Sequence, residues 1–336
     1  MKAVGYRRPL PIEDPASLVD LELPSPAPAP RDVRVRVRAI SVNPVDTKVR
    51  RGTSPAPGET KVLGWDAVGI VDALGANATK FAVGDRVYYA GSISRPGADS
   101  EQHLVDERIA ALAPASLGDA EAAALPLTTI TAYELLFERL GVPKGGGEGQ
   151  TLVIIGAAGG VGSILVQLAR QLTGLRVIAT ASRAETRRWC LDLGAHAVID
   201  HGRPVAAELA AGGFGPVDIV ASLTRTPQHY AEIIASLKPQ GRLGVIDDMA
   251  ALDPMLLKPK SISLHWEYMF TRPLFATSDL AEQGRLLAEA ADLVDAGRIR
   301  TTATANFGAI NAANLRRAHA LIESGQARGK VVLAGF

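Results

Sequence analysis

The 336 residues carry a formal net charge of +1 and are 47% hydrophobic. The near-neutral charge argues against a nucleic-acid partner, and the single cysteine, Cys190, excludes internal disulfides and a multi-cysteine zinc site. The length predicts about two domains, and the absence of a signal-like segment after Met1 or of about 18 consecutive apolar residues predicts a cytoplasmic protein without a membrane partner.

The first third of the chain has the pattern of a small β-barrel. Four prolines between residues 24 and 30 predict an extended connector, after which valine alternates with arginine over residues 33–38. We interpret the arginine row as the solvated face of a strand and not as an anion-binding patch, because the chain as a whole is near neutral. Short strands separated by glycine and proline continue to residue 106, which is typical of a barrel.

The pattern changes near Asp119. Helices are predicted over residues 120–125 and 127–140, and a long amphipathic helix over 279–296. Strands that alternate with helices predict a doubly wound parallel sheet; these strands span residues 152–155, 176–181, 197–200, 217–222 and 241–246, with a last edge strand at 261–266. The tail, ending in the strand 330–333, is expected to return to the first domain. The predicted domains are 1–126 with 275–336, and 127–274.

A glycine-rich turn follows the strand 152–155 and opens a helix. Its sequence has the form G-x-G-x-x-G, with Ala157 in the first place. Glycines there let the backbone approach a pyrophosphate, whose charge the N-terminus of the helix then holds. The strand–turn–helix context predicts dinucleotide binding by Ala158, Gly159, Gly160, Val161 and Gly162.

The end of the next predicted strand indicates which nicotinamide cofactor binds. An NAD site places Asp or Glu there, to accept a hydrogen bond from the ribose 2′-hydroxyl, but this chain has Ser182 and Arg183. Serine can bond a 2′-phosphate and arginine can pair with its charge, so the sequence predicts NADPH. Two alternatives stay open: Ser182 and Glu185 also form a capping-box pattern, and Arg183 can be a solvated surface charge.

Several motifs occur in an order that resembles the medium-chain dehydrogenase/reductase superfamily. Within it, the chain is similar to the quinone oxidoreductase branch and to its subgroup called "zinc-type alcohol dehydrogenase-like". The resemblance implies an α/β chain with a GroES-like β-barrel domain and a Rossmann domain, and an active site in the cleft between them. The motifs that carry it are Asn43-Pro44-Val45-Asp46-Thr47, Gly64-Trp65-Asp66-Ala67-Val68-Gly69, Gly84-Asp85-Arg86-Val87, Leu125-Pro126-Leu127 with Thr131-Ala132-Tyr133, the turn from Gly156 to Gly162, and Gly329-Lys330-Val331-Val332-Leu333.

The positions that bind zinc in alcohol dehydrogenases of this superfamily lack suitable ligands here. The early cysteine is replaced by Asp46, the histidine of the Gly-His-Glu turn by Trp65, and no cysteine lies near the domain junction. The six histidines show no ligand-like spacing. Because a catalytic zinc ion needs about three protein ligands, the sequence predicts no metal.

The resemblance also assigns further cofactor-binding residues and a homodimer. The nicotinamide is expected between residues 43–47 on the barrel side and Thr131 with Val245-Ile246 on the Rossmann side, and His201 is expected beside the adenosine phosphate. The remaining residues implied in cofactor binding are Pro44, Thr131, Ser222, Leu223, Val245, Ile246 and Lys330. Dimerisation is expected through the edge strand 261–266.

These observations predict a zinc-independent oxidoreductase that transfers hydride from NADPH to a quinone or an α,β-unsaturated carbonyl compound. Such acceptors take the incoming charge on oxygen and need no Lewis acid. Candidate catalytic residues are Asn43, Asp46, Lys48 and Tyr133; Lys48 stands where quinone oxidoreductases often carry a tyrosine. An exposed, non-catalytic Lys48 and proton donation by solvent stay open. Two other functions stay open: a non-catalytic NADPH-binding protein, and a zinc alcohol dehydrogenase, which the ligand set disfavours.

Overall fold

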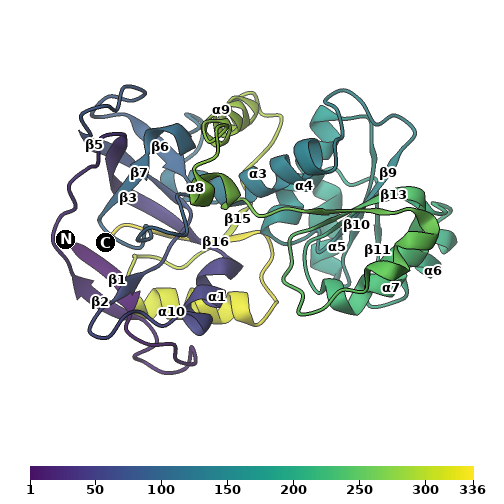
Figure 1. Ribbon diagram of the computed structural model, residues 1–336, viewed down its shortest axis with the longest axis horizontal. Helices are drawn as coiled ribbons and strands as arrows, with labels where there is room; N and C mark the ends of the chain where they lie inside the picture. The colour runs from purple at the N-terminus through teal and green to yellow at the C-terminus, as the bar shows by residue number, and fades with distance from the viewer. The chain divides into compact units, whose positions relative to one another are not determined.

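The computed structural model describes all 336 residues, which form two compact units (Figure 1). Unit 1 comprises Met1–Ile130 and Phe270–Phe336, and unit 2 comprises Thr131–Met269. The sequence predicts the two boundaries at 126/127 and 274/275. The first boundary of the structure, after Ile130, lies inside helix α3 (Pro126–Tyr133). Figure 1 shows both chain termini in unit 1.

Unit 1 is built around the long strand β3 (Asp32–Val42). Its valines are buried while Arg36 and Arg38 are exposed, so the predicted solvated arginine face is confirmed. β3 pairs with β5 (Ala67–Leu74), β7 (Gln102–Asp106) and β16 (Lys330–Ala334). Its sheet has the order β15-β16-β3-β5-β6-β8, and a second, smaller sheet has the order β2-β1-β4. The other strands are β1 Lys2–Tyr6, β2 Val19–Glu22, β4 Lys61–Val62, β6 Arg86–Tyr89, β8 Ala110–Leu112 and β15 Ala303–Asn306.

The tail of the chain belongs to unit 1, as predicted. Strand β16 runs antiparallel to β3, with Val332 opposite Ser41. This pairing completes the sheet with residues almost three hundred positions away in the sequence. The helical segments of the unit are α1 Pro44–Gly52, η1 Glu107–Ile109, α2 Asp119–Ala123, α8 Thr271–Phe275, α9 Glu282–Asp295 and α10 Ala312–Glu323.

Helix α1 was not predicted, although its start carries local signals. Asn43 is the N-cap, Pro44 occupies the first helical turn and Asp46 is the third helical residue. Asn before proline, with an acid three positions later, is a usual N-terminal pattern. The first third of the chain is thus β-rich, as predicted, and contains α1 in addition.

Unit 2 contains a six-stranded parallel sheet with the order β11-β10-β9-β12-β13-β14. The predicted doubly wound sheet is confirmed. The order reverses between β9 and β12, and such a switch point, at the carboxyl ends of the strands, is where ligands bind in this architecture. The strands are β9 Thr151–Ile155, β10 Arg176–Thr180, β11 Ala197–Ile199, β12 Val217–Ser222, β13 Leu237–Val245 and β14 Ser263–Trp266.

Helices of unit 2 pack aliphatic side chains onto this sheet. Ile233 of α7 and Leu209 of α6, for example, join one buried cluster with Val153 and Val220 of the central strands. The segments are η2 Glu134–Arg139, α4 Gly160–Leu172, α5 Ala184–Asp192, α6 Val205–Ala211, α7 Thr226–Ser236, η3 Pro254–Leu256 and η4 Lys258–Lys260.

Two predicted elements of unit 2 differ from the structure. The helix predicted over 127–140 is α-helical only to Tyr133 and continues as the π-helical segment η2. Strand β13 begins at Leu237 and not at Gly241, and its pairing with β12 contains a register shift. A π-helical turn is rare and occurs frequently at functional sites.

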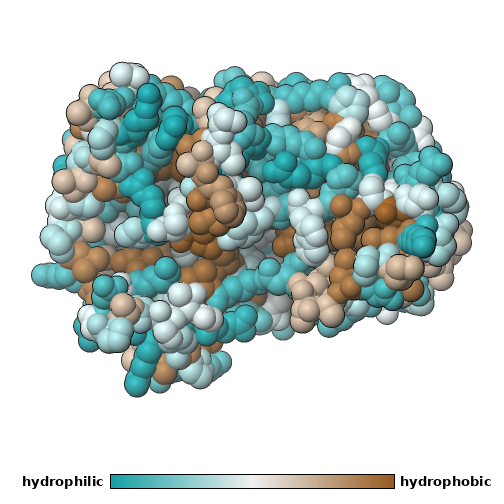
Figure 2. Space-filling view, in the orientation of Figure 1, coloured by the Kyte–Doolittle hydropathy of each residue, from teal (hydrophilic) through white to brown (hydrophobic).

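The helices of the structure are too short or too polar to span a membrane. None of them combines the length and hydrophobicity that crossing a bilayer requires. On the face drawn in Figure 2, hydrophobic patches are separated by hydrophilic residues.

Candidate functional site

The glycine-rich turn has the geometry that a pyrophosphate requires. Gly159 is the N-cap of α4, in extended conformation. A Cβ at Gly162 would lie 2.5 Å from both Ala157 Cα and Gly156 O, so only glycine lets the helix pack this closely on the turn. Gly156 has φ +81°, a conformation that glycine adopts without strain.

The N-terminus of α4 is free to hold an anion. Its first turn contains no acidic residue, and the first N–H groups of any helix lack acceptors within the helix. Residues 158–161 are partly exposed. The turn therefore fits the pyrophosphate of a dinucleotide.

Other predicted cofactor residues of unit 2 lie at the same edge of the sheet. Leu223 N donates to Ile155 O (3.2 Å), and Ile246 N donates to Ser222 O (3.3 Å). These bonds join the carboxyl ends of β9, β12 and β13. The Ser222 hydroxyl is buried and bonds the Thr226 hydroxyl (2.8 Å), while Val245 is fully buried.

Ser182 and Arg183 are exposed directly after β10. Helix α5 begins at Ala184 with Arg183 as the N-cap, so the capping box that the sequence offered for Ser182 does not form. Glu185 instead pairs with Arg183 at 3.6 Å, with both side chains largely exposed. The pair Ser182–Arg183 is thus available to a phosphate.

His201 lies close to this pair. Ala181 N donates to Ile199 O (3.0 Å), which places the end of β10 beside the end of β11, where His201 follows. Burial lowers the pKa of His201, and its Nδ1 is buried without a hydrogen-bond partner. A neutral imidazole with an unsatisfied nitrogen fits a polar ligand at this position.

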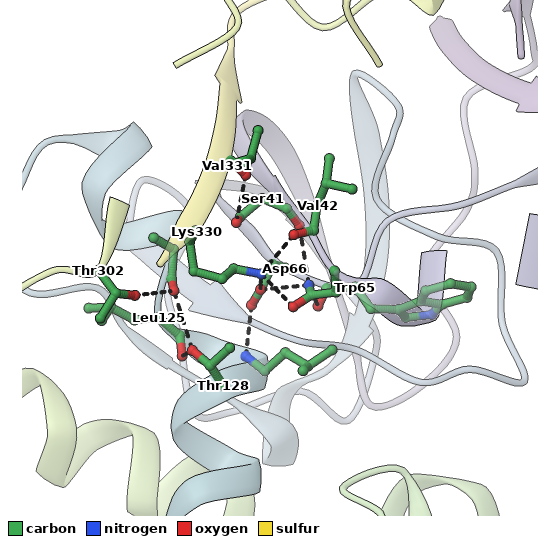
Figure 3. A network of polar contacts seen from close by, with 12 residues as sticks. Ser41, Val42, Trp65, Asp66, Leu125, Thr128, Thr302, Lys330 and Val331 are labelled. Atoms are coloured by element: carbon green, nitrogen blue, oxygen red, sulfur yellow. Dashed lines mark hydrogen bonds and ion pairs between the residues drawn. The ribbon is translucent and has the colours of Figure 1, made fainter. Parts of the chain in front are cut away.

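In unit 1, the predicted site residues Asn43 and Lys330 meet Asp66 in one buried polar network (Figure 3). Lys330 Nζ lies 3.0 Å from Asp66 Oδ2 and donates to Val42 O (3.0 Å) and to Asn43 Oδ1. Asn43 Nδ2 donates to Asp66 Oδ2 (2.8 Å). The other oxygen of Asp66 accepts from Leu127 N (2.7 Å).

Asp46 is tied to the same region through backbone groups. Its carboxylate accepts from Asn43 N (2.6 Å) and from Gly64 N (3.1 Å). Burial raises the pKa of Asp46 to about 7, although both N–H bonds oppose the shift. Burial likewise raises the pKa of Asp66, and the Lys330 ammonium opposes it.

A buried carboxyl that the sequence did not indicate completes this cluster. Asp99 lies on the other side of Gly64, where a Cβ would overlap its Oδ1. Burial and the negative charge of Asp46 raise the pKa of Asp99 well above its ordinary value. Because Asp46 accepts two N–H bonds, which favour its ionised form, the proton of this pair resides on Asp99.

The donor set does not fit a catalytic zinc ion. The Lys330 ammonium already lies against Asp66, Asp46 is bound to two N–H groups, and the indole of Trp65 donates to Ser92 O (3.1 Å). Figure 3 shows the Trp65 ring pointing away from Asp66. Cys190 is buried in unit 2, and burial raises its thiol pKa to about 12. No group of three His, Cys, Asp or Glu side chains could hold a metal ion.

The remaining candidates lie outside these two clusters. Pro44 and Lys48 are exposed on α1. Thr131 is buried on α3. The Tyr133 ring packs on Phe137, with ring centroids 4.7 Å apart, and Lys144 Nζ lies 5.0 Å from the Tyr133 ring.

The carboxyl pair predicts a pH-dependent stability that Asp99→Asn reduces. An acid whose pKa is raised by folding destabilises the protein as the pH rises above its unfolded value, by about 1.4 kcal/mol per pH unit until the folded pKa is reached. We expect the variant to gain thermal stability relative to wild type between about pH 4 and pH 7. Unfolding monitored by circular dichroism at each pH measures the difference.

Asp279→Asn provides the opposite control. Arg272 lowers the pKa of Asp279 to about 2, so that carboxylate stabilises the protein above its unfolded pKa. This variant should therefore be less stable than wild type by a difference that develops between about pH 2 and pH 4 and stays constant from about pH 4 to pH 7. A difference for Asp99→Asn that does not change with pH would contradict the proton assignment.

Comparison with known proteins agrees with this architecture. Residues 29–120 match the family model "Alcohol dehydrogenase GroES-like domain", and residues 193–333 match "Zinc-binding dehydrogenase". A "Zinc-type alcohol dehydrogenase-like protein" of Staphylococcus epidermidis is 36% identical over 336 residues, which cover 99% of each chain.

Solved structures give the same relationship. A Rhizobium etli protein, provisionally assigned as a zinc-dependent alcohol dehydrogenase, has a TM-score of 0.96 and 58% identity, covering 100% of this chain and 98% of its own. Escherichia coli quinone oxidoreductase complexed with NADPH has a TM-score of 0.84 and 25% identity, covering 99% and 100%. The chain is an oxidoreductase of the medium-chain dehydrogenase/reductase superfamily and belongs to its zinc-type alcohol dehydrogenase-like family.

Proposed function

We propose that this oxidoreductase transfers hydride from NADPH to a quinone or an α,β-unsaturated carbonyl compound without a metal ion. The observation that carries the cofactor choice is the exposed pair Ser182–Arg183 at the end of β10, where an NAD site has an acid. The NADPH complex of the similar Escherichia coli quinone oxidoreductase supports the same choice.

The residues of this chain contribute binding and electrostatics to that reaction. The N-terminus of α4 holds the pyrophosphate, and Arg183 pairs with the 2′-phosphate. The nicotinamide supplies the hydride when it is bound. The negative charge that then develops on the acceptor oxygen needs a proton or a positive group.

Among the candidate catalytic residues, Lys48 suits this last task best. Its ammonium is exposed on α1, whereas Asn43 and Asp46 are buried in the polar network and Tyr133 is buried. An ammonium can stabilise an enolate or donate a proton to it.

The proposal predicts NADPH oxidation that does not depend on metal. We expect turnover with quinones or enones, measured by loss of NADPH absorbance, and no change after prolonged treatment with a zinc chelator. Inhibition by the chelator that added zinc reverses would contradict the metal-free mechanism. Tight NADPH binding without turnover across quinones, enones and aldehydes would favour the non-catalytic function.

Arg183→Glu tests the cofactor choice. Reversing this charge should raise the KM for NADPH about tenfold or more, because a charge-assisted bond to phosphate contributes about 1.5–3 kcal/mol, and should change the KM for NADH little. Arg188→Glu is the matched control, since Arg188 is exposed on the same helix and pairs with Asp192 at 2.8 Å. Equal effects of Arg183→Glu on both cofactors would contradict the assignment.

We also propose a homodimer formed through β14. This strand is at the edge of the parallel sheet with β13 as its neighbour, and Trp266 on it is 50% exposed. An unprotected edge strand with an exposed aromatic residue is suited to pairing with a second copy. Light scattering should give twice the monomer mass, and Trp266→Arg should lower it toward the monomer; a monomeric wild type would contradict this interface.

A further inference from the structure

Unit 2 contains a second buried carboxyl pair, formed by Glu134 and Glu267. Glu134 is the first residue of the π-helical segment η2, and Glu267 directly follows β14. Both side chains are fully buried, with 0% exposure. The metal-free reductase proposed above does not use either of them.

The two carboxyl groups lie beside one guanidinium. Arg139 Nε donates to Glu267 Oε2 at 2.9 Å, and Arg139 Nη2 lies 3.7 Å from Glu134 Oε2. Glu267 Oε1 is buried without a hydrogen-bond partner. Two buried carboxylates beside one guanidinium would leave one negative charge uncompensated, so the cluster of three groups is neutral with one proton bound.

The surroundings favour this protonated state. Burial and the nearby Glu134 raise the pKa of Glu267 to about 9, and Arg139 opposes the shift. The other charged or titratable side chains on the elements packed here are Glu138 on η2, Lys238 and Arg242 on β13, and His265 on β14; Lys238 pairs with Asp218 at 2.9 Å. Glu138 lies 3.8 Å from Arg139, and Arg242 is held by Gln150 Oε1 (2.9 Å) and Leu140 O.

The pair connects two segments that carry predicted nicotinamide contacts. Glu267 N donates to Val245 O (2.9 Å), at the carboxyl end of β13. Thr131 precedes Glu134 by three residues in the helix that continues from α3 into η2, so both lie on one face. The cluster of Glu134, Arg139 and Glu267 therefore joins the helix that carries Thr131 to the strand end that carries Val245.

We propose that Glu134 and Glu267, sharing one proton beside Arg139, are positioning residues that hold the π-helical turn against the end of β14, and that cofactor binding requires this proton. The proposal rests on the proposed NADPH-dependent function. Loss of the proton places two negative charges in a buried site with one guanidinium, which separates the two segments.

NADPH binding to the full-length protein, followed by cofactor fluorescence between about pH 7 and pH 10, tests the proposal. We expect the wild-type Kd to rise about tenfold between pH 8 and pH 10, as one linked ionisation predicts. The 2′-phosphate of NADPH does not contribute, because its second ionisation is complete well below pH 8. Glu267→Gln keeps an acceptor for Arg139 and a donor for Glu134 but cannot ionise, so its Kd should stay near the wild-type value and not rise.

Glu138→Gln is the matched control, because it removes a neighbouring carboxylate of the same segment and should retain the wild-type alkaline rise. Thermal unfolding of each variant at each pH verifies that the protein measured is folded. An alkaline rise in Kd that persists in folded Glu267→Gln, or a wild-type Kd that does not change with pH, would overturn this proposal while leaving NADPH binding intact. Failure of the wild type to bind NADPH at any pH would overturn the proposed function as well.

Discussion

The architecture of unit 1 depends on one buried ammonium. Lys330 begins strand β16 near the C-terminus, and its Nζ binds Asp66, Asn43 and Val42, which all belong to the N-terminal segment. Removing one partner of a buried ion pair typically costs about 3–5 kcal/mol, because the other charge stays buried without compensation. The network therefore fixes the returning tail against β3 and the start of α1.

The positions that bind zinc in alcohol dehydrogenases of this superfamily are occupied here by groups that bind one another or the backbone. Asp66 faces Lys330, and Asp46 is bound by two backbone N–H groups. Trp65 fills the position of a ligand histidine with an indole that donates to Ser92 O. The Lys330 ammonium and backbone N–H donors thus satisfy the carboxylates that a metal ion would need.

Each unit contains a buried pair of carboxyl groups, and two negative charges buried side by side would repel each other. Two carboxyl groups are buried together, Asp46 with Asp99 and Glu134 with Glu267, and in each case burial raises a pKa so that one group keeps its proton. The pairs differ in their neighbours. Backbone N–H groups hold Asp46 in its ionised form, whereas the Arg139 guanidinium contacts both carboxyl groups of the pair in unit 2. Asp46 and Asp99 both lie against Gly64. Glu134 and Glu267 lie on a helix and at a strand end, respectively.

Local sequence patterns determined the parallel sheet, the glycine turn and the strand end at Ser182–Arg183, because periodicity, glycine spacing and the missing acid are properties of consecutive residues. Local patterns also contain the helix-start signals of α1, at Asn43, Pro44 and Asp46, although this helix was not predicted. Only the tertiary structure decided where Ser182 stands relative to α5, and that the predicted helix becomes π-helical at Glu134. It alone brought Asp99 against Gly64, Lys330 against Asp66 and Glu267 against Glu134. Each of these contacts joins residues far apart in the chain, and no local propensity encodes which buried charge will face which.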